Sequence, residues 1–310
     1  MARTCAVTGA TGFLGRHLVR ALAADGWRVR ALVRRDPVSA FGQAETEVVI
    51  GGLDEGPLAE LCRGVDVVIH AAGLVKARDR ATFEAVNAHG TTLAAQAARA
   101  ARARMVLVSS LAAREPQLSE YAASKRAGEV AAAALLGPEL AIVRPPAIYG
   151  PGDLETLQIF RFAARSPLLP VFDARARLAM IHVADAAEQI AAAAARPPDR
   201  PCVALADARP EGYGWRDIVE AAAEAVGRRS PLTAPAPPVI LTWAGALGSL
   251  ARRFGARPML TLGKARELRW LDWSVKPEEF WTQAPPSKFA LGEGFRHTVA
   301  YWREAQGFNV

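Results

Sequence analysis

The sequence lacks long apolar runs and has only three cysteines among its 310 residues. A membrane-spanning helix needs roughly 20 consecutive apolar residues, whereas the alanine-rich stretches here are interrupted by charge. Cys5, Cys62 and Cys202 are far apart and have no metal-ligand spacing. We therefore expect no transmembrane helix, no metal site and no disulfide framework, with the thiols kept reduced in the cytoplasm. A strand pattern begins at Thr4, so we also expect no secretory signal.

A clustered basic surface of the kind that binds nucleic acid is also missing, although the net charge is +7. The arginines are dispersed over helical faces, such as Arg99, Arg102 and Arg104, and over loops, such as Arg196 and Arg200. Hydrophobic residues make up 51% of the chain and charges of both signs are mixed, which is typical of a globular protein. We expect no nucleic-acid partner.

A glycine-rich turn near the start is the most informative feature that is present. Gly9, Gly12 and Gly15 follow an apolar run and precede an amphipathic stretch. In a strand–turn–helix unit, such glycines allow a tight turn, a close approach of backbone to a pyrophosphate, and close packing of helix on strand. The free N–H groups at the start of the helix also attract phosphates. The turn therefore predicts a dinucleotide site.

Strand-like runs alternate with helical patterns through the first half of the chain. The expected strands are residues 4–8, 28–33, 47–50, 65–70, 105–109 and 140–144. The expected helices of this half are residues 12–24, 80–103 and 119–136. This alternation predicts an α/β fold, a Rossmann-type doubly wound parallel sheet in which ligands bind at the carboxyl ends of the strands.

The pattern changes after Gly150, where proline clusters appear and where six of the seven tryptophans lie. We expect helices at residues 183–195 and 215–226 and a strand at 202–205. The predicted domains are an NAD(P)-binding Rossmann domain at 1–150 and a smaller, mainly helical substrate-binding lobe at 151–310. Segments near 180–206 are expected to return to the first domain.

Tyr121 and Lys125 are four residues apart in a helical stretch, which places both on one helix face. A nearby ammonium stabilises the phenolate and lowers the pKa of the tyrosine, which suits it to general acid–base catalysis. Ser109 and Ser110 end a strand, where a hydroxyl can bind a substrate oxygen. We favour Ser110 over Ser109 for this role. The alternatives are a surface Tyr–Lys pair and a turn-forming serine pair.

Together with further segments, these residues resemble the extended short-chain dehydrogenase/reductase superfamily, in its NAD(P)-dependent epimerase/dehydratase group. The matching segments cover nearly the whole chain: residues 8–15, 52–54, 70–73, Asn87, Ser110, Tyr121, Lys125, 144–153 and 182–187. Arg144-Pro145-Pro146 stands where sugar-nucleotide enzymes often have an asparagine. This segment is more similar to the branch of 3β-hydroxysteroid dehydrogenase-like enzymes and dihydroflavonol reductases. The interval between Ser110 and Tyr121 is unusually short for the group.

The resemblance implies hydride transfer at a carbon that bears oxygen, with Tyr121, Lys125 and Ser110 as catalytic residues. It implies that Lys125 also binds the nicotinamide ribose and that Asn87 supports the active site without touching substrate. The cofactor-binding residues that we expect are Gly9, Thr11, Gly12, Phe13, Leu14, Arg34, Arg35, Leu53, Asp54, Ala71, Ala72, Gly73, Val108, Tyr121, Lys125 and Pro145. Members of the group often form homodimers, so the sequence leaves a homodimer open.

The end of the second strand bears on the form of the cofactor. NAD-preferring relatives usually have an acidic residue there, whereas this sequence has Val33 followed by Arg34 and Arg35. An uncharged residue beside guanidinium groups suits the 2′-phosphate of NADP. We therefore expect NADP. The alternative is NAD, with Asp36 taking up the ribose contact.

The sequence thus predicts an NADP-dependent oxidoreductase that acts on a hydroxyl or ketone of a small, fairly apolar molecule. One alternative is a sugar-nucleotide epimerase or dehydratase, in which the cofactor is reduced and reoxidised within one turnover. Another is a non-catalytic nucleotide-binding subunit, which the presence of both Tyr121 and Lys125 disfavours. The apolar stretch at residues 239–254 has a basic end, and it predicts either a helix packed over the substrate cleft or a peripheral membrane contact.

Overall fold

A computed structural model describes residues 3–35, 41, 46–229, 231–237, 239–253 and 261–306. The chain divides into two compact units. Unit 1 comprises Met1–Pro145, Ala187–Ala204 and Trp281–Pro285, and unit 2 comprises Pro146–Ala186, Leu205–Phe280 and Pro286–Val310. The unit with the glycine-rich turn therefore takes in a later segment, which supplies a helix and a strand.

Unit 1 is built on a seven-stranded sheet whose strand pairs are all parallel. The strands, in spatial order, are β11 (Cys202–Ala204), β6 (Leu140–Arg144), β5 (Arg104–Val108), β4 (Val67–His70), β1 (Thr4–Thr8), β2 (Arg28–Val33) and β3 (Thr46–Ile50). The strand order reverses between β1 and β4, so this is the switch point at which doubly wound sheets bind their ligands. The predicted fold class is confirmed.

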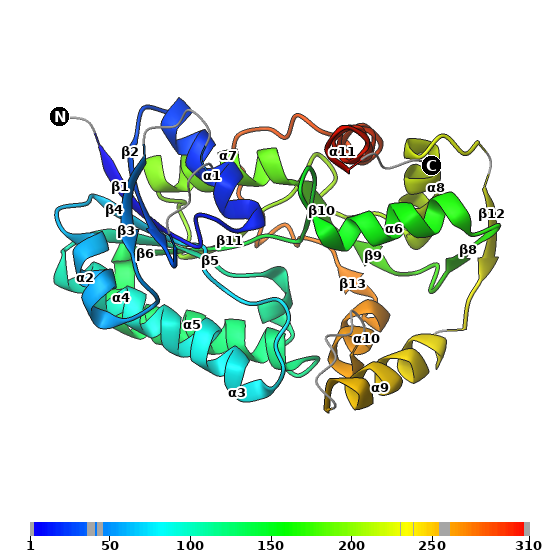
Figure 1. Ribbon diagram of the computed structural model, residues 1–310, viewed down its shortest axis with the longest axis horizontal. Coiled ribbons are helices and arrows are strands. Elements are labelled where there is room, and N and C mark those ends of the chain that lie inside the picture. The colour runs from blue at the N-terminus through cyan, green and yellow to red at the C-terminus, as the bar shows by residue number, and fades with distance from the viewer. Residues whose placement is uncertain are drawn as a thin grey trace. The chain divides into compact units, whose positions relative to one another are not determined.

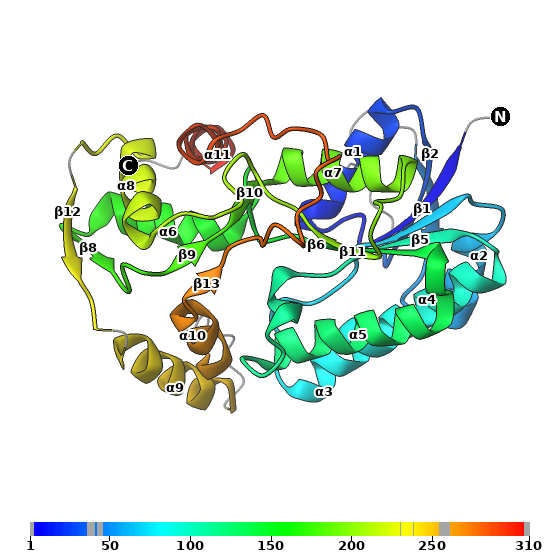
Figure 2. The same ribbon diagram turned by 180° about the vertical axis from the view of Figure 1, so that it is seen from behind.

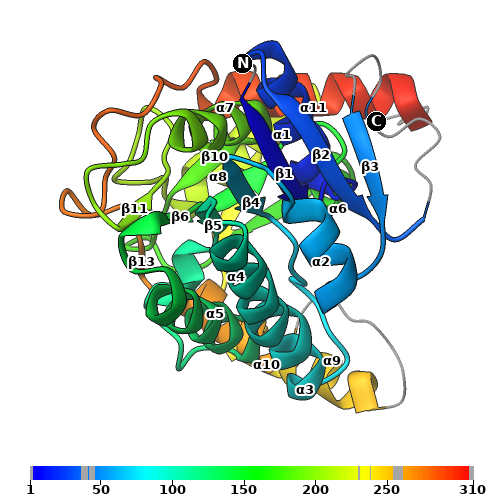
Figure 3. The same cartoon turned by 90° about the vertical axis from the view of Figure 1, so that its left-hand side faces the viewer.

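Helices cover both faces of this sheet. Figures 1 and 3 show α1 (Phe13–Ala24) and α7 (Val183–Ala195) on one face, and α2 (Glu55–Cys62), α4 (Gly90–Ala100) and α5 (Glu120–Leu136) on the other. On the second face, fully buried Leu58 and Leu61 of α2 join a core with Ala98 of α4 and with Met105 and Leu107 of β5. Small alanines let α4 approach the sheet closely, which explains why so alanine-rich a sequence still makes a dense core.

The helix predicted over residues 80–103 is three segments in the structure. A short α3 (Arg80–Phe83) is followed by a π-helical segment, η1 (Glu84–His89), and then by α4. Asp79 caps α3 by accepting a hydrogen bond from the Thr82 N–H at 2.8 Å. Widened π turns are rare and recur at functional sites, and this one carries Asn87.

The other elements of unit 1 follow local signals. Ser119 caps α5 by accepting from the Ala122 N–H at 3.0 Å, and the helix ends at Gly137, whose φ is +51°. The short 3₁₀ segments η2 (Leu111–Arg114) and η3 (Gly137–Glu139) precede and follow α5.

Unit 2 has three two-stranded parallel sheets and five helices among its described residues (Figure 2). The strand pairs are β7 (Ala147–Tyr149) with β10 (Met180–His182), β8 (Leu168–Val171) with β12 (Leu232–Pro235), and β9 (Arg177–Leu178) with β13 (Asp272–Trp273). The helices are α6 (Leu154–Arg165), α8 (Trp215–Ala225), α9 (Val239–Arg253), α10 (Leu262–Arg269) and α11 (Leu291–Gln306). Tyr149, Phe160 and Phe295 form the centre of its core, with edge-to-face ring contacts at 4.9 and 5.1 Å. Over the described ranges, no helix is both long enough and apolar enough to cross a membrane.

Candidate active site

The glycine-rich turn brings the carboxyl end of β1 against that of β4. Gly9 has a φ of +72°, and a Cβ added there would lie 2.7 Å from the backbone of Ala71 and Ala72. A Cβ on Gly15 would lie 2.0 Å from the Gly9 carbonyl oxygen. Both positions therefore require glycine. Gly9 needs it for its positive φ and for the close approach to the backbone after β4, and Gly15 needs it for packing of α1 on the turn.

The start of α1 suits an anionic ligand. Gly12 occupies the N-cap position and has no side chain to cap the first N–H groups of the helix, and its own N–H donates to the Gly9 carbonyl at 3.0 Å. The first turn contains no acidic residue. The uncapped N–H groups and the positive end of the helix dipole thus fit a dinucleotide pyrophosphate. Of the predicted contact residues here, Thr11 is exposed, and Phe13 and Leu14 are half-buried.

His70, at the end of β4, is completely buried in a hydrogen-bond chain. Its Nδ1 lies 2.8 Å from Thr8 Oγ1 and its Nε2 lies 3.2 Å from Thr91 Oγ1. Thr91 donates its hydroxyl proton to the Asn87 carbonyl at 2.7 Å, so it accepts a proton from Nε2. Nδ1 therefore accepts from Thr8, whose oxygen in turn accepts from the Ala72 N–H at 3.2 Å. These hydrogen bonds connect the ends of β1 and β4. They account for a buried histidine at this position by a structural role, without a bound metal or a part in catalysis.

Asn87 connects the segment after β4 to α5. Its Oδ1 accepts from the Leu74 N–H at 2.8 Å, and its Nδ2 donates to the Leu74 carbonyl at 2.9 Å and to Ser124 Oγ at 3.0 Å. Ser124 donates in turn to the Tyr121 carbonyl at 2.8 Å. A Cβ on Gly73 would lie 3.1 Å from Asn87 Oδ1. Asn87 thus fixes both the loop at Gly73 and the first turn of α5.

Lys125 lies at the meeting point of β4, β5 and α5. Its Nζ donates to the Val108 carbonyl, at the end of β5, at 2.8 Å, and it lies 3.7 Å from the Cβ position of Gly73. Burial lowers the pKa of Lys125 to about 8, an effect that the charge of Glu129 opposes. Tyr121 stands one turn earlier on α5, half-buried, with its ring 6.1 Å from that of Phe83. The structure therefore brings Lys125 to Gly73 and Val108, one helical turn from Tyr121.

Ser109 and Ser110 have different environments. Ser109 Oγ donates to Glu129 Oε1 at 2.6 Å, and Arg144 donates to both oxygens of the same carboxylate at 2.8 and 2.7 Å. Although burial raises the pKa of Glu129, the hydrogen bonds and charge of Arg144, with help from Ser109 and Arg126, hold that pKa below its usual range. Ser110 is half-buried, and its Oγ accepts from the Ala112 N–H at 3.2 Å, which leaves its hydroxyl proton able to be donated.

Sequence reasoning missed Glu129, although a signal was present. Glu129 follows Lys125 by four residues and Tyr121 by eight, so it lies on the same face of α5. A carboxylate on the buried face of a helix needs a cationic partner, and Arg144 at the end of a predicted strand was the available one.

The residues predicted to bind the adenosine half lie at the ends of β2 and β3. The Val33 side chain is 2% exposed, whereas Arg34 and Arg35 are exposed. Leu53 is half-buried, and exposed Asp54 is the N-cap residue of α2. Asp36 lies outside the described residues. On the other side of the switch point, Pro145 accepts from the Leu111 N–H at 2.8 Å, which anchors the segment after Ser110.

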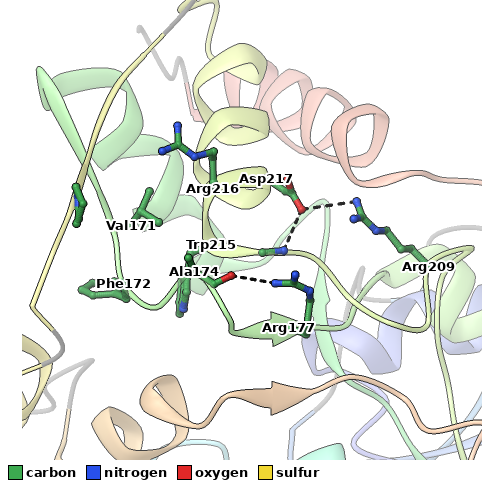
Figure 4. A pocket seen from close by; sticks show the side chains of 10 residues that line it. Val171, Phe172, Ala174, Arg177, Arg209, Trp215, Arg216 and Asp217 are labelled. Atoms are coloured by element: carbon green, nitrogen blue, oxygen red, sulfur yellow. Dashed lines mark hydrogen bonds and ion pairs between the residues drawn. The ribbon is translucent and has the colours of Figure 1, made fainter.

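Unit 2 contains a cavity of about 440 Å³ near the start of α8 (Figure 4). Its lining residues are Val171, Phe172, Ala174, Arg177, Arg209, Gly214, Trp215, Arg216, Asp217 and Pro235. Arg209 lies 3.6 Å from Asp217 in an ion pair, and Arg177 donates to the Ala174 carbonyl at 3.1 Å. The ion pair joins the loop before α8 to that helix, and the second interaction lies within the segment from β8 to β9. We assign the cavity no ligand. Among the residues that the structure describes, no cluster of three or more His, Cys, Asp or Glu could hold a metal ion.

A family model described as the NAD dependent epimerase/dehydratase family matches residues 5–202, which include the switch point and the Tyr121–Lys125 helix. The chain belongs to this family. It is 52% identical over 302 residues to a ceramide reductase from Caulobacter vibrioides, a match that covers 97% of this chain and 94% of that protein. It is 35% identical over 227 residues to a 4-hydroxy-2-methyl-3-oxo-4-farnesyl-3,4-dihydroquinoline-1-oxide ketoreductase from Stigmatella aurantiaca, which covers 66% of this chain and 68% of that protein.

Solved structures of the family share the fold. A dTDP-glucose 4,6-dehydratase from Streptomyces venezuelae, with NAD bound, gives a TM-score of 0.71 at 21% identity over 98% of each chain. The family predicted from the sequence is confirmed, and with reductases among its relatives the chain is an NAD(P)-dependent oxidoreductase.

We predict that His70 makes stability depend on pH. Burial, together with the charge of Lys125, lowers the pKa of His70 to about 3, whereas an unfolded histidine titrates near 6.5. Below pH 6.5 the unfolded state binds a proton at His70 that the folded state does not bind. The free energy of unfolding therefore decreases as the pH falls. The wild type should lose about 2 kcal/mol more than His70→Asn between pH 7 and pH 5. Urea unfolding at both pH values measures this, and exposed His89→Asn is the control. Identical pH dependence of the wild type and His70→Asn would contradict the prediction.

Proposed function

We propose that the chain is an NADP-dependent reductase of the cytoplasm that reduces a ketone on a ceramide-like lipid. The observation that carries this proposal is the position of Lys125, whose Nζ bonds the end of β5 beside Gly73 and one helical turn from Tyr121. The substrate class rests on the 52% identity with a ceramide reductase over nearly the whole chain. A second relative whose name carries a farnesyl group and a ketoreductase activity favours an apolar ketone as well.

The chain's own residues supply the proton and the positioning. In the proposed step, the Tyr121 phenol donates its proton to the substrate carbonyl oxygen. A nicotinamide cofactor, when bound, would supply the hydride that the carbonyl carbon needs. The Lys125 ammonium stabilises the phenolate that Tyr121 becomes. Ser110 donates a hydrogen bond to the same substrate oxygen and holds it within reach of Tyr121.

Support for a cytoplasmic protein comes from the cysteines. Cys5 and Cys62 are buried, Cys202 is half-buried, and none of the three is in a disulfide bond. Burial raises the pKa of Cys5 to about 12 and that of Cys62 to about 11, which leaves both unreactive. Free, inert thiols suit a reducing compartment.

NADP is favoured over NAD by the end of β2. Buried Val33 cannot bind ribose hydroxyls, and the exposed guanidinium groups of Arg34 and Arg35 follow it directly. A phosphate monoester carries close to two negative charges, and arginine can bind it with paired, charge-assisted hydrogen bonds.

Arg34→Ala should therefore raise the KM for NADPH by roughly 10- to 100-fold, the effect of losing charge-assisted hydrogen bonds, and should leave the KM for NADH nearly unchanged. Steady-state kinetics with both cofactors measures the ratio. Arg20→Ala, which removes an exposed arginine on α1, is the matched control. An equal change for NADH and NADPH would refute the case for NADP at this position.

Ser110→Ala should lower kcat by roughly 10²- to 10³-fold, because a hydrogen-bond donor to the reacting oxygen is lost, and should lower the melting temperature only slightly, through loss of the bond from the Ala112 N–H. Ser109→Ala should do the reverse: it removes a hydrogen bond to buried Glu129 and lowers the melting temperature, with kcat near that of the wild type. The two variants control for each other. The opposite pattern would assign the role to Ser109.

Tyr121→Phe should lower kcat for reduction of an oxidised, ketone-bearing ceramide by roughly 10²- to 10⁴-fold. NADPH should still raise the melting temperature of the variant, because the ring remains and the phosphate site is intact. NADPH oxidation at 340 nm follows the reaction. Turnover of a sugar nucleotide without net NADPH consumption would support the epimerase or dehydratase alternative. Unchanged biological function of Tyr121→Phe would support a non-catalytic subunit.

A further inference from the structure

One face of α9 is apolar and exposed. Its members are Val239 (52% exposed), Ile240 (53%), Trp243 (70%), Leu247 (68%) and Leu250 (52%), which we call the α9 stripe. At about 100° per residue, these five lie within roughly a third of the helix circumference. One-third of the fifteen large apolar side chains that are exposed over the described part of the chain thus lie on one helix. Phe254, the last residue of the apolar stretch singled out in the sequence, lies outside the described residues.

The opposite face of α9 already has a partner, which is α10 (Figure 2). A Cβ on Gly245 would lie 2.9 Å from the Cβ of Ala265, so the helices approach closely there. Ser249 Oγ accepts from the Leu262 N–H at 2.8 Å, which fixes the start of α10 against α9. Because α10 packs on the opposite face of α9, the stripe is not the surface that α9 buries against α10. It stays exposed in the α9–α10 pair.

The same segment is strongly basic. Residues 239–270 contain six arginines and lysines and one acidic residue, a net charge of +5 out of +7 for the whole chain. The one acidic residue, Glu267, is 6% exposed and lies 3.1 Å from Lys264. Arg266 and Arg269 of α10 are exposed. This segment combines an exposed apolar stripe with a positive field that no exposed acidic residue in it offsets.

We propose that the α9–α10 pair docks on an anionic lipid bilayer, with the α9 stripe inserted among the headgroups. Fifteen residues of helix are about 22 Å long, too short to span a bilayer, so α9 would lie in the plane of the interface. Exposed Trp243 is the residue type that anchors at this depth. The basic residues suit anionic headgroups, to which clusters of lysine and arginine are drawn. A second copy of the chain is a poorer occupant because it would present the same net charge of +5 to its partner.

This proposal goes beyond the reductase activity and does not depend on it. It concerns only α9 and α10, and it would stand if the substrate were soluble. Its test therefore measures binding of the full-length protein to vesicles in the absence of cofactor and substrate.

The test is co-sedimentation with vesicles of phosphatidylcholine, with or without phosphatidylglycerol. The wild type should bind the anionic vesicles at least about tenfold more tightly than the neutral ones. Raising the salt from about 0.1 M to about 0.5 M should abolish most of that difference. Trp243→Ser/Leu247→Ser should lower the affinity for anionic vesicles at least about tenfold. Leu168→Ser/Leu232→Ser, which removes leucines 48% and 69% exposed on β8 and β12, should bind like the wild type.

The stripe variant should keep the melting temperature of the wild type, because both changed side chains are exposed, and this measurement shows that it is folded. Equal binding of the wild type to both kinds of vesicle, or no binding, would overturn the proposal. So would wild-type affinity in the stripe variant. A wild-type dimer that the stripe variant converts to monomer, without vesicle binding by either, would assign the stripe to a second copy. Loss of reductase activity alone would bear only on the proposed function.

Discussion

The geometry of the candidate site depends on the buried ion pair between the carboxylate of Glu129 and the guanidinium of Arg144. The carboxylate accepts hydrogen bonds from Ser109 at the end of β5 and from Arg144 at the end of β6, and it projects from the helix that carries Tyr121 and Lys125. Removing one partner of such a buried pair typically costs 3–5 kcal/mol, because the other charge is left without compensation. The pair therefore fixes the rotation and the height of α5 on the sheet. In that position Lys125 donates a hydrogen bond to the Val108 carbonyl.

A second set of contacts fixes the ends of β1 and β4, where the dinucleotide is expected to bind. Glycines at positions 9 and 15 let the turn after β1 lie against the segment after β4, and the His70 chain holds the two strand ends together. Asn87 extends this connection to α5 through Ser124. The parts that would hold the dinucleotide and the parts that would move the proton are thus joined by buried polar bonds within one unit. Satisfied networks of this kind favour a single arrangement of the groups they join.

Much of the fold could be predicted because its signals are local. The strands at residues 4–8, 28–33 and 140–144 have the predicted bounds, since each is a short apolar run with a clear end. No helix was predicted at α2, whose first turn contains Gly56-Pro57, although a proline in the first turn costs a helix little. The π segment at Glu84–His89 could not be predicted, since its register depends on the bonds of Asn87 to Leu74 and Ser124.

The residue types of the candidate site could be predicted from the sequence, but most of the hydrogen-bond partners of those residues could not. Tyr121 and Lys125 could be placed on one helix face by their spacing. The different environments of Ser109 and Ser110 could not be predicted, because Ser109 bonds to Glu129, which lies 20 residues away. The distribution of charge on the surface was also hard to predict from the sequence. The arginines are dispersed along the chain, but in residues 239–270, which include the exposed apolar helix face, six basic residues stand against a single acidic one. Neither feature alone distinguishes a solvated helix from a docking surface, and their coincidence on α9 and α10 is what favours a lipid surface.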